Sequence, residues 1–327
     1  MKAKNILIDI AVIVILIVIL WGLNRIFIIK DINLYNYEGY MAQEKNTVDI
    51  LVMGSSHSMN AIDSSELDTY LSESGINTKT FNMSITGMRF ESMCYRLKEA
   101  LKTQSPKLLV IETFSATPMS YSNPEVTRRY ALDYMPLSIN KLAYVYRYID
   151  ENRFSYIFPL LRYHYRWQEL GIEDYEILNP RIQKMKSERM GINAFTEDVV
   201  WPDDDGYFNT DYSECNEMEP LDDEVYEALS EIMTIASERG MKVLFVSIPY
   251  KIQMGYSSDH LVKNNNYIRD KFCDNTDVFM LDMNRMYKDM NWTYDCMQDE
   301  GHVNTYGRSL VMPVLADYIR DNIDGLR

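Results

Sequence analysis

A short apolar strand that runs directly into a turn of small hydroxyl residues constrains this chain most strongly. Residues 48–53 read Val-Asp-Ile-Leu-Val-Met, a pattern typical of a strand that is buried on both faces. Gly54-Ser55-Ser56 follows, and Asp63-Ser64-Ser65-Glu66 then carries the signature of a helix N-terminus with a capping box. In an open α/β sheet, ligands bind at the carboxyl ends of the strands. Ser56 is therefore a candidate functional residue.

Alternating strands and helices continue along the chain. Apolar runs bounded by turn residues predict four more strands, at 79–83, 107–113, 242–249 and 278–281. Helical periodicity predicts helices at 64–74, 88–103, 222–239, 259–274 and 305–323. Such alternation implies a mostly parallel sheet with right-handed crossovers. We therefore expect an α/β fold, a flavodoxin-like three-layer α/β/α sandwich with a five-stranded parallel sheet.

A serine at pH 7 is a poor nucleophile unless a base takes its proton, so Ser56 needs a histidine from elsewhere in the chain. Asp299 and His302 lie three residues apart on a predicted loop after the last strand. The carboxylate can hold the imidazole in one tautomer, and such a relay is recognised by the roles of its members and not by their order. Backbone N–H groups beside Ser56, near a helix N-terminus, can hold an oxyanion.

Three blocks of this sequence resemble those of the SGNH (GDSL-like) hydrolases. Gly54-Ser55-Ser56 resembles the first block, residues 82–87 (Asn-Met-Ser-Ile-Thr-Gly) the second, and Asp299-x-x-His302 the last. The resemblance covers about 48–115 and 222–325. It implies a catalytic triad of Ser56, Asp299 and His302, and an oxyanion hole formed by the N–H groups of Ser56 and Gly87 with the side chain of Asn82. It implies neither a cofactor nor a metal.

Two positions depart from the family pattern. The aspartate that usually precedes the nucleophile is Ser55 here, as in branches that modify cell-surface polymers. The third block, normally Gly-x-Asn-Asp, reads Val-Ile-Glu-Thr-Phe-Ser over 110–115, so the usual asparagine donor is absent. A group near Thr113 is a candidate oxyanion donor or substrate contact in its place.

The first thirty residues indicate a membrane anchor. Every residue from Ile10 to Leu23 is apolar, and 6–8 extend this run to about 18 residues with only Asp9 interrupting it, near the lower limit for crossing a bilayer. Lys2 and Lys4 precede it, which favours a cytoplasmic N-terminus. No small-residue cleavage site follows, so we prefer an uncleaved anchor to a signal peptide or a buried core helix. We expect a cytoplasmic tip and transmembrane helix over 1–26, a stalk over 27–46, and an extracytoplasmic SGNH-like catalytic domain over 47–327.

Composition excludes some alternatives. The formal net charge of -15 argues against general binding to nucleic acid, because no basic field would steer a polyanion to the protein. The four cysteines show no metal-ligand spacing. One disulfide is compatible with an extracytoplasmic location, and the sequence does not choose its pairing.

An insertion at about 119–220 separates the third strand from the next helix. Its first part interleaves tyrosine with arginine, and we weigh two interpretations. The first is a helical cap whose aromatic side chains pack on the sheet. The second is a wall that stacks sugar rings or binds an anionic polymer through Arg162 and Arg166. Its second part is acidic, and Asp203-Asp204-Asp205-Gly206 lacks the twelve-residue calcium pattern, which favours a solvated acidic loop.

These patterns favour an extracytoplasmic serine esterase or O-acyltransferase acting on acyl esters of a cell-surface polymer. The resemblance implies two partners. One is an exopolysaccharide or a teichoic acid that accepts acetyl or D-alanyl groups, and the other is a membrane-bound acyltransferase. The alternative is a non-catalytic SGNH-fold scaffold that binds a surface polymer or a membrane acyltransferase. A flavodoxin-like cofactor binder would need a glycine-rich phosphate loop, which 55–60 lacks. His57 is expected to be structural, because its side chain points away from that of Ser56 if the backbone is extended.

Overall fold

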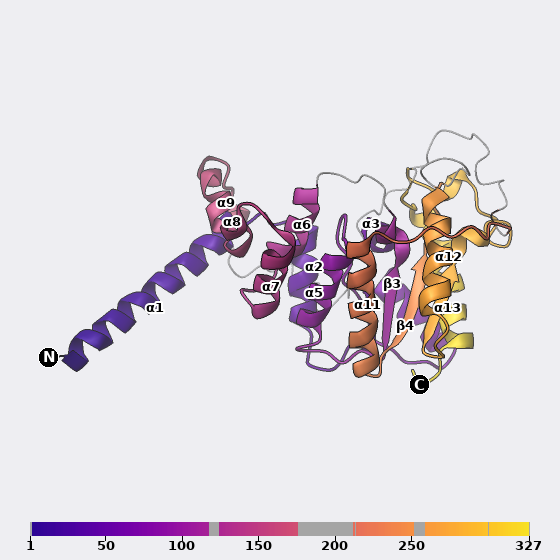
Figure 1. The fold of residues 1–327 in the computed structure, drawn as a ribbon, viewed down its shortest axis with the longest axis horizontal. Helices are drawn as coiled ribbons and strands as arrows, with labels where there is room; N and C mark the ends of the chain where they lie inside the picture. Colours follow the sequence, from indigo (N-terminus) through magenta and orange to yellow (C-terminus); the bar gives the residue numbers. More distant parts are fainter. Residues whose placement is uncertain are drawn as a thin grey trace.

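In the computed structural model, five parallel strands form one sheet in the order β2-β1-β3-β4-β5 (Figure 1). The structure describes residues 2–117, 124–175, 212, 214–251, 259–299 and 301–326. The strands are β1 (Ile50–Met53), β2 (Thr80–Asn82), β3 (Leu108–Glu112), β4 (Lys242–Ser247) and β5 (Val278–Asp282). Each lies within a strand predicted from the sequence or extends one residue beyond it. The strand order is that of the flavodoxin-like sandwich, so the predicted fold class is confirmed.

Side chains of β1 alternate between two apolar clusters, as the period of a strand requires. Leu51 and Met53 belong to the cluster on one face of the sheet, and Ile50 and Val52 to the cluster on the other. All four are fully buried. This two-sided burial is why the strand reads as an almost continuous apolar run in the sequence.

Helices cover both faces of the sheet. One face carries α3 (Ser56–Ala61), α4 (Ser64–Glu73) and α13 (Thr305–Asn322), and the other carries α5 (Phe90–Ala100), α11 (Asp223–Glu238) and α12 (His260–Phe272). The predicted start of α4 is confirmed, because the Asp63 carboxylate accepts hydrogen bonds from the N–H groups of Ser65 and Glu66. Gly75 follows its end with φ +79°.

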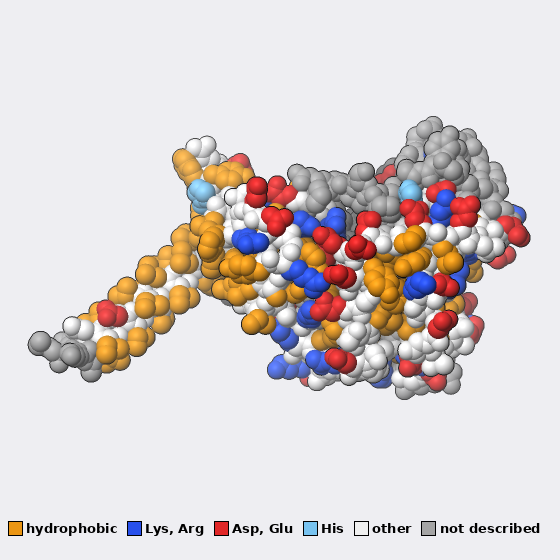
Figure 2. Space-filling model, viewed as in Figure 1, with side chains coloured by type: hydrophobic (Ala, Val, Ile, Leu, Met, Phe, Trp, Pro, Cys, Tyr) orange, Lys and Arg blue, Asp and Glu red, His pale blue; other side chains and the backbone are white. Residues whose placement is uncertain are grey.

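Helix α1 (Lys2–Phe27) projects from the folded domain, and its apolar side chains are exposed along its length (Figures 1 and 2). Within it, residues Asn5–Phe27 form a 23-residue apolar segment whose most hydropathic stretch is not buried in the protein, and the last turn, at 24–27, is partly covered. At 1.5 Å per residue this segment is about 35 Å long, enough to cross a hydrocarbon core of about 30 Å. Helix α1 is therefore long and apolar enough to span a membrane.

Residues 27–46, predicted as a stalk, contain helix α2 (Ile32–Met41), which packs into the folded domain. Asp31 caps it, and Leu34, Tyr37 and Tyr40 lie in the core cluster. The ring of Tyr40 meets Phe81 of β2 edge-on, with 5.1 Å between centroids. A stalk would leave these side chains in water, so the segment belongs to the domain.

The described part of the insertion is helical, as the first interpretation expected. It comprises α6 (Pro124–Leu132), α7 (Ile139–Tyr148), α8 (Arg153–Ile157) and α9 (Leu160–Tyr163), then the short 3₁₀ turns η2 (His164–Gln168) and η3 (Ile172–Tyr175). Their main neighbours are α5, α2 and α1 and not the strands, so they form an added layer beyond the sandwich. The acidic loop around Asp203–Gly206 lies outside the described residues.

The four cysteines, Cys94, Cys215, Cys273 and Cys296, are all free thiols. Cys94 and Cys296 are fully buried, and burial raises the pKa of the Cys94 thiol to about 12. Cys94 and Cys296 behave as small apolar core residues.

Because α2 belongs to the core, Tyr40→Ala should lower the free energy of unfolding by about 3–5 kcal/mol, the usual cost of truncating a buried aromatic side chain. Tyr306→Ala is the matched control, since that ring is 53% exposed and its loss should change stability by no more than about 0.5 kcal/mol. Urea unfolding of the detergent-solubilised protein measures both. Equal stability of the two variants would contradict the placement of α2 in the core and would support the prediction of a stalk over 27–46.

Candidate active site

Ser56 lies where β1 leads into α3, at the carboxyl edge of the sheet. The side chain of Ser55 accepts a hydrogen bond from the His57 N–H and so caps α3. Ser56 is therefore the first residue of a helix, and its own N–H has no acceptor within that helix. The backbone at Ser56 and His57 is helical. The expectation that His57 points away from Ser56 assumed an extended backbone and therefore does not apply.

The three predicted triad side chains lie in hydrogen-bonded sequence. Ser56 Oγ lies 2.7 Å from His302 Nε2. The Nδ1 atom of the same ring lies 2.9 Å and 2.8 Å from the Oδ1 and Oδ2 atoms of Asp299. When Nδ1–H donates to Asp299, Nε2 is left as the acceptor for the Ser56 hydroxyl. This is the arrangement that a nucleophile, a base and an orienting carboxylate require.

The loop that carries Asp299 and His302 is closed by backbone hydrogen bonds. Met297 and Val303 form an antiparallel bridge, and the Gln298 N–H donates to the His302 carbonyl over 2.8 Å. Asn304 then caps α13 by accepting from the Gly307 N–H. These hydrogen bonds hold the loop in one conformation and so fix the position of Asp299 relative to His302.

Asp299 stays ionised at neutral pH. Partial burial raises its pKa, but the hydrogen bonds and charge of His302, together with the N–H groups of Gly301 and His302, outweigh burial and hold the pKa below its usual range. The carboxylate can therefore stabilise an imidazolium at His302 without accepting its proton.

A buried carboxylate that the sequence did not single out supports the turn at residues 54–56, which carries the candidate nucleophile and is called here the nucleophile turn. Glu112, the last residue of β3, is fully buried and accepts from the Ser55 N–H over 3.1 Å and from the Ser55 hydroxyl over 2.8 Å. Its other oxygen accepts from the Phe114 N–H. Burial raises the pKa of Glu112 to about 7, although these hydrogen bonds oppose the shift. Glu112 and Ser55 thereby join the turn after β1 to the turn after β3.

Glycine at position 54 allows this close approach. A Cβ atom at Gly54 would lie 2.5 Å from Glu112 Cβ and 2.4 Å from Ser58 Oγ, both far inside contact distance. Any larger residue at position 54 would push the strand ends apart.

His57 packs into an aromatic cluster beneath the triad. Its ring lies 3.5 Å from that of Phe114, 5.6 Å from Tyr250 and 4.9 Å from His302, centroid to centroid. Burial, and then the neighbouring His302, lower the pKa of His57, so it is neutral at physiological pH. A neutral ring adds no repulsion when His302 gains a proton. A Cβ atom at Gly301 would lie 2.7 Å from His57 Cε1, so glycine there lets the triad loop lie against the cluster.

The second block lies beside the nucleophile turn, and helix α2 holds it. The Ile85 N–H donates to the Gly54 carbonyl over 3.1 Å, which joins the loop of Gly87 (φ +62°) to the turn after β1. Asn36 of α2 donates to the Ser84 carbonyl, and Asn33 accepts from the Thr86 N–H. The segment predicted as a stalk therefore supports one wall of the site.

The Asn82 side chain does not fit the predicted oxyanion role. Its amide nitrogen donates to the carbonyls of Ser58 and Ile62 at 2.9 and 2.8 Å, and its oxygen accepts from the Ser84 N–H. Both donor hydrogens of the amide are used in supporting the second block.

Thr113 is not on the exposed surface of the site. It follows Glu112 at the end of β3 and is fully buried. Its hydroxyl has no hydrogen-bond partner among the described residues.

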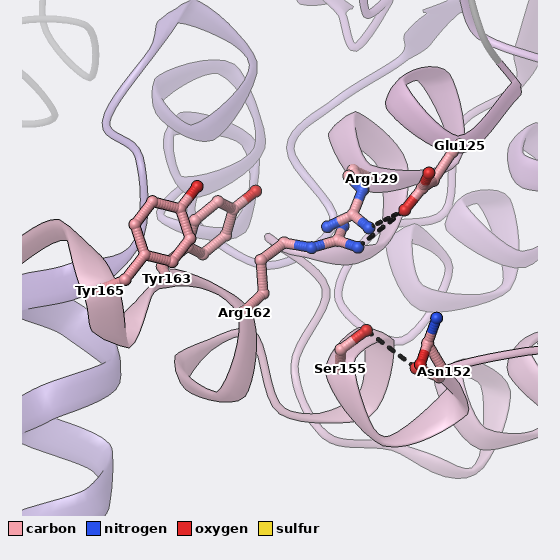
Figure 3. Close-up of a pocket in the computed structure, with 7 residues that line it drawn as sticks. All are labelled: Glu125, Arg129, Asn152, Ser155, Arg162, Tyr163 and Tyr165. Atoms are coloured by element: carbon pink, nitrogen blue, oxygen red, sulfur yellow. Dashed lines mark hydrogen bonds and ion pairs between the residues drawn. The ribbon is translucent and has the colours of Figure 1, made fainter.

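Arg162 belongs to α9 and Arg166 to η2, and α9 lies beside the end of α1, whereas α3, which begins with Ser56, lies next to the sheet (Figure 1). Arg162 binds Glu125 and lines a separate pocket of about 490 Å³ with Arg129 and Tyr163 (Figure 3). Arg166 donates to the Phe27 carbonyl at the end of α1. Neither arginine forms a wall of the triad site, so the predicted substrate contact at these positions is corrected.

No known family model matches this chain, and no curated protein matches it. Among the described residues, no group of three or more histidine, cysteine or carboxylate side chains is placed to hold a metal ion.

The raised pKa of Glu112 predicts a pH-dependent stability. Between its unfolded pKa of about 4.5 and its folded pKa of about 7, the unfolded chain releases a proton that the folded protein keeps. The free energy of unfolding should therefore fall as pH rises from 5 to 7.5, by up to about 3 kcal/mol. Glu112→Gln should remove this component of the slope. A Glu112→Gln variant with the wild-type slope in urea unfolding would contradict the argument.

Proposed function

We propose that this protein is a membrane-anchored serine esterase or O-acyltransferase of SGNH type that acts on acyl esters of a cell-surface polymer. The observation that carries the proposal is the continuous hydrogen-bonded path from Ser56 Oγ through His302 to Asp299. Binding alone would not require a serine hydroxyl aligned with a histidine that a carboxylate orients.

In the first half of the proposed reaction, Ser56 Oγ attacks the carbonyl carbon of the acyl ester while its proton moves to His302 Nε2. The negative charge on the carbonyl oxygen is held by backbone N–H groups of Ser56 and Gly87. When the tetrahedral intermediate collapses, His302 returns the proton to the leaving alcohol, and an acyl-Ser56 ester remains.

In the second half, His302 Nε2 removes a proton from the acceptor hydroxyl, whose oxygen attacks the acyl-Ser56 carbonyl. When this second tetrahedral intermediate collapses, the bond to Ser56 Oγ breaks and His302 returns the proton to Ser56 Oγ, which restores the free serine. The acceptor is water in an esterase and a polymer hydroxyl in a transferase. The described insertion helices pack on α5, α2 and α1, so in the described residues they supply no wall that would select a polymer acceptor.

The location is part of the proposal. Helix α1 is long and apolar enough to span a membrane, and Lys2 and Lys4 precede its apolar segment. By the positive-inside rule we place the N-terminus in the cytoplasm and the domain outside. Extracytoplasmic polymers such as an exopolysaccharide or a teichoic acid would then be within reach, with a membrane-bound acyltransferase as the source of acyl groups.

A non-catalytic scaffold is the second candidate, and Glu112 favours it. Its carboxylate stands in the third block where a hydrolase of this type carries a neutral asparagine donor, and the Asn82 amide is used elsewhere. A negative charge bonded to Ser55, the residue next to the proposed nucleophile, opposes formation of an oxyanion. Protonation of Glu112, whose pKa is raised to about 7, would relieve that opposition.

Turnover of p-nitrophenyl acetate by the full-length protein in detergent tests the proposal. Ser56→Ala should abolish it, since loss of the serine from such a triad costs on the order of 10⁶-fold. Asp299→Asn should lower kcat by on the order of 10⁴-fold, because an amide favours the wrong tautomer of His302.

Ser309→Ala is the control, since this exposed serine bonds only locally, to the Tyr306 carbonyl, on the helix that follows His302. It should retain wild-type turnover. If the Ser56→Ala protein hydrolysed the ester as fast as the Ser309→Ala protein, the scaffold would replace the enzyme as the better account.

A further inference from the structure

The end of helix α1 is bound to a small apolar surface, which we call the α8–η3 platform and define as residues 153–175. It contains α8, α9, η2 and η3, which lie beside the C-terminal end of α1 (Figure 1). Seven of its large apolar or aromatic side chains are exposed: Phe154, Phe158, Leu161, Tyr165, Trp167, Ile172 and Tyr175. Among the described residues from 212 onward only three such side chains are exposed, so the platform carries more of them than that whole part of the domain.

Polar contacts fix the platform to α1. The Leu160 N–H at the start of α9 donates to the Asn24 side chain over 2.9 Å, and Arg166 donates to the Phe27 carbonyl over 2.5 Å. Asp174 of η3 lies 3.5 Å from Arg166 Nη2 and 3.6 Å from Lys30 Nζ. The platform therefore has a set position relative to the helix axis.

That position coincides with the headgroup layer of a bilayer spanned by α1. The apolar run ends at Leu23, and the contact residues Asn24 and Phe27 follow by one and four positions, about 1.5–6 Å along the axis. Each headgroup layer is about 5–8 Å thick, so the platform begins within it. Figure 2 shows orange side chains of α1 leading up to the apolar surface at this end of the domain.

The kind of side chain fits the same layer. Tyr165, Trp167 and Tyr175 each combine an apolar ring with one polar group, and all three are more than half exposed. Tyrosine and tryptophan are the residues that gather where hydrocarbon meets water, since the ring and the polar group are each satisfied there.

We propose that the α8–η3 platform rests in the lipid headgroup region beside α1, as a second membrane contact that sets the orientation of the domain. The proposal depends on α1 spanning the membrane, which is part of the proposed function, and does not depend on catalysis. A single helix would leave the domain free to swing, whereas two contacts hold it at one angle to the bilayer. The occupant is lipid, because a bilayer spanned by α1 necessarily meets this surface.

Depth measurements by spin labelling test the proposal. The background is the full-length protein with Cys215→Ser and Cys273→Ser, since Cys94 and Cys296 are fully buried and out of reach of the label. Single nitroxides are attached through Tyr165→Cys on the platform, Tyr306→Cys as an equally exposed control on α13, and Val14→Cys within α1. The protein is placed in nanodiscs of phosphatidylcholine and phosphatidylglycerol. Accessibility to oxygen, which concentrates in lipid, is compared with accessibility to a water-soluble nickel chelate.

We expect the labels at 165 and 14 to be several-fold less accessible to the chelate than the label at 306. A label at 165 as accessible as that at 306, while the label at 14 is protected, would overturn the platform and leave the anchor standing. An accessible label at 14 would overturn both. Protection at 165 in native membranes but not in lipid nanodiscs would overturn lipid as the occupant in favour of a membrane protein. Ester turnover, measured on the same samples, tests the proposed catalysis independently of the membrane contact.

Discussion

The hydrogen bonds that join Ser55 to Glu112 are the interaction on which the candidate site depends most. A parallel sheet brings the carboxyl ends of its strands to one edge, where each chain must turn away and leave backbone N–H groups to be satisfied. Glu112 accepts from Ser55 and Phe114 together, so one carboxyl group satisfies donors from the turns after β1 and β3. Ser56 takes its position from the same turn, and only glycine at position 54 leaves space for the contact.

The sandwich could be predicted because its elements carry local signals. Strands buried on both faces are apolar without interruption, and Asp63 and Gly75 mark the two ends of α4 in the sequence itself. The relay of Ser56, Asp299 and His302 could be predicted because three residue types with distinct roles follow predicted strands. The sequence alone could not predict the hydrogen bond of 2.7 Å between Ser56 and His302, because it joins residues that lie 246 positions apart.

Other features depend on tertiary contacts that have no local signature. The segment of helix α2 was predicted as a stalk because it lies between the apolar N-terminal run and the first strand, and only packing shows that Tyr40 fills the core while Asn33 and Asn36 bind the second block. Glu112 looked like a departure from a motif, and its role appears only beside Ser55. The amide of Asn82 and the guanidinium of Arg162 had suitable chemistry, but neighbouring carbonyl groups and Glu125 already bind them.

The central claim is that Ser56 is an activated nucleophile, and covalent labelling tests it most directly. A fluorophosphonate forms a bond between its phosphorus and an activated serine oxygen with loss of fluoride, and an unactivated serine is left unmodified. Peptide mass spectrometry of the full-length protein after such treatment should find one adduct, on Ser56, and none in a His302→Ala variant. Labelling of neither protein, or equal labelling of Ser56 in both, would contradict the account, because the serine would then owe no reactivity to His302.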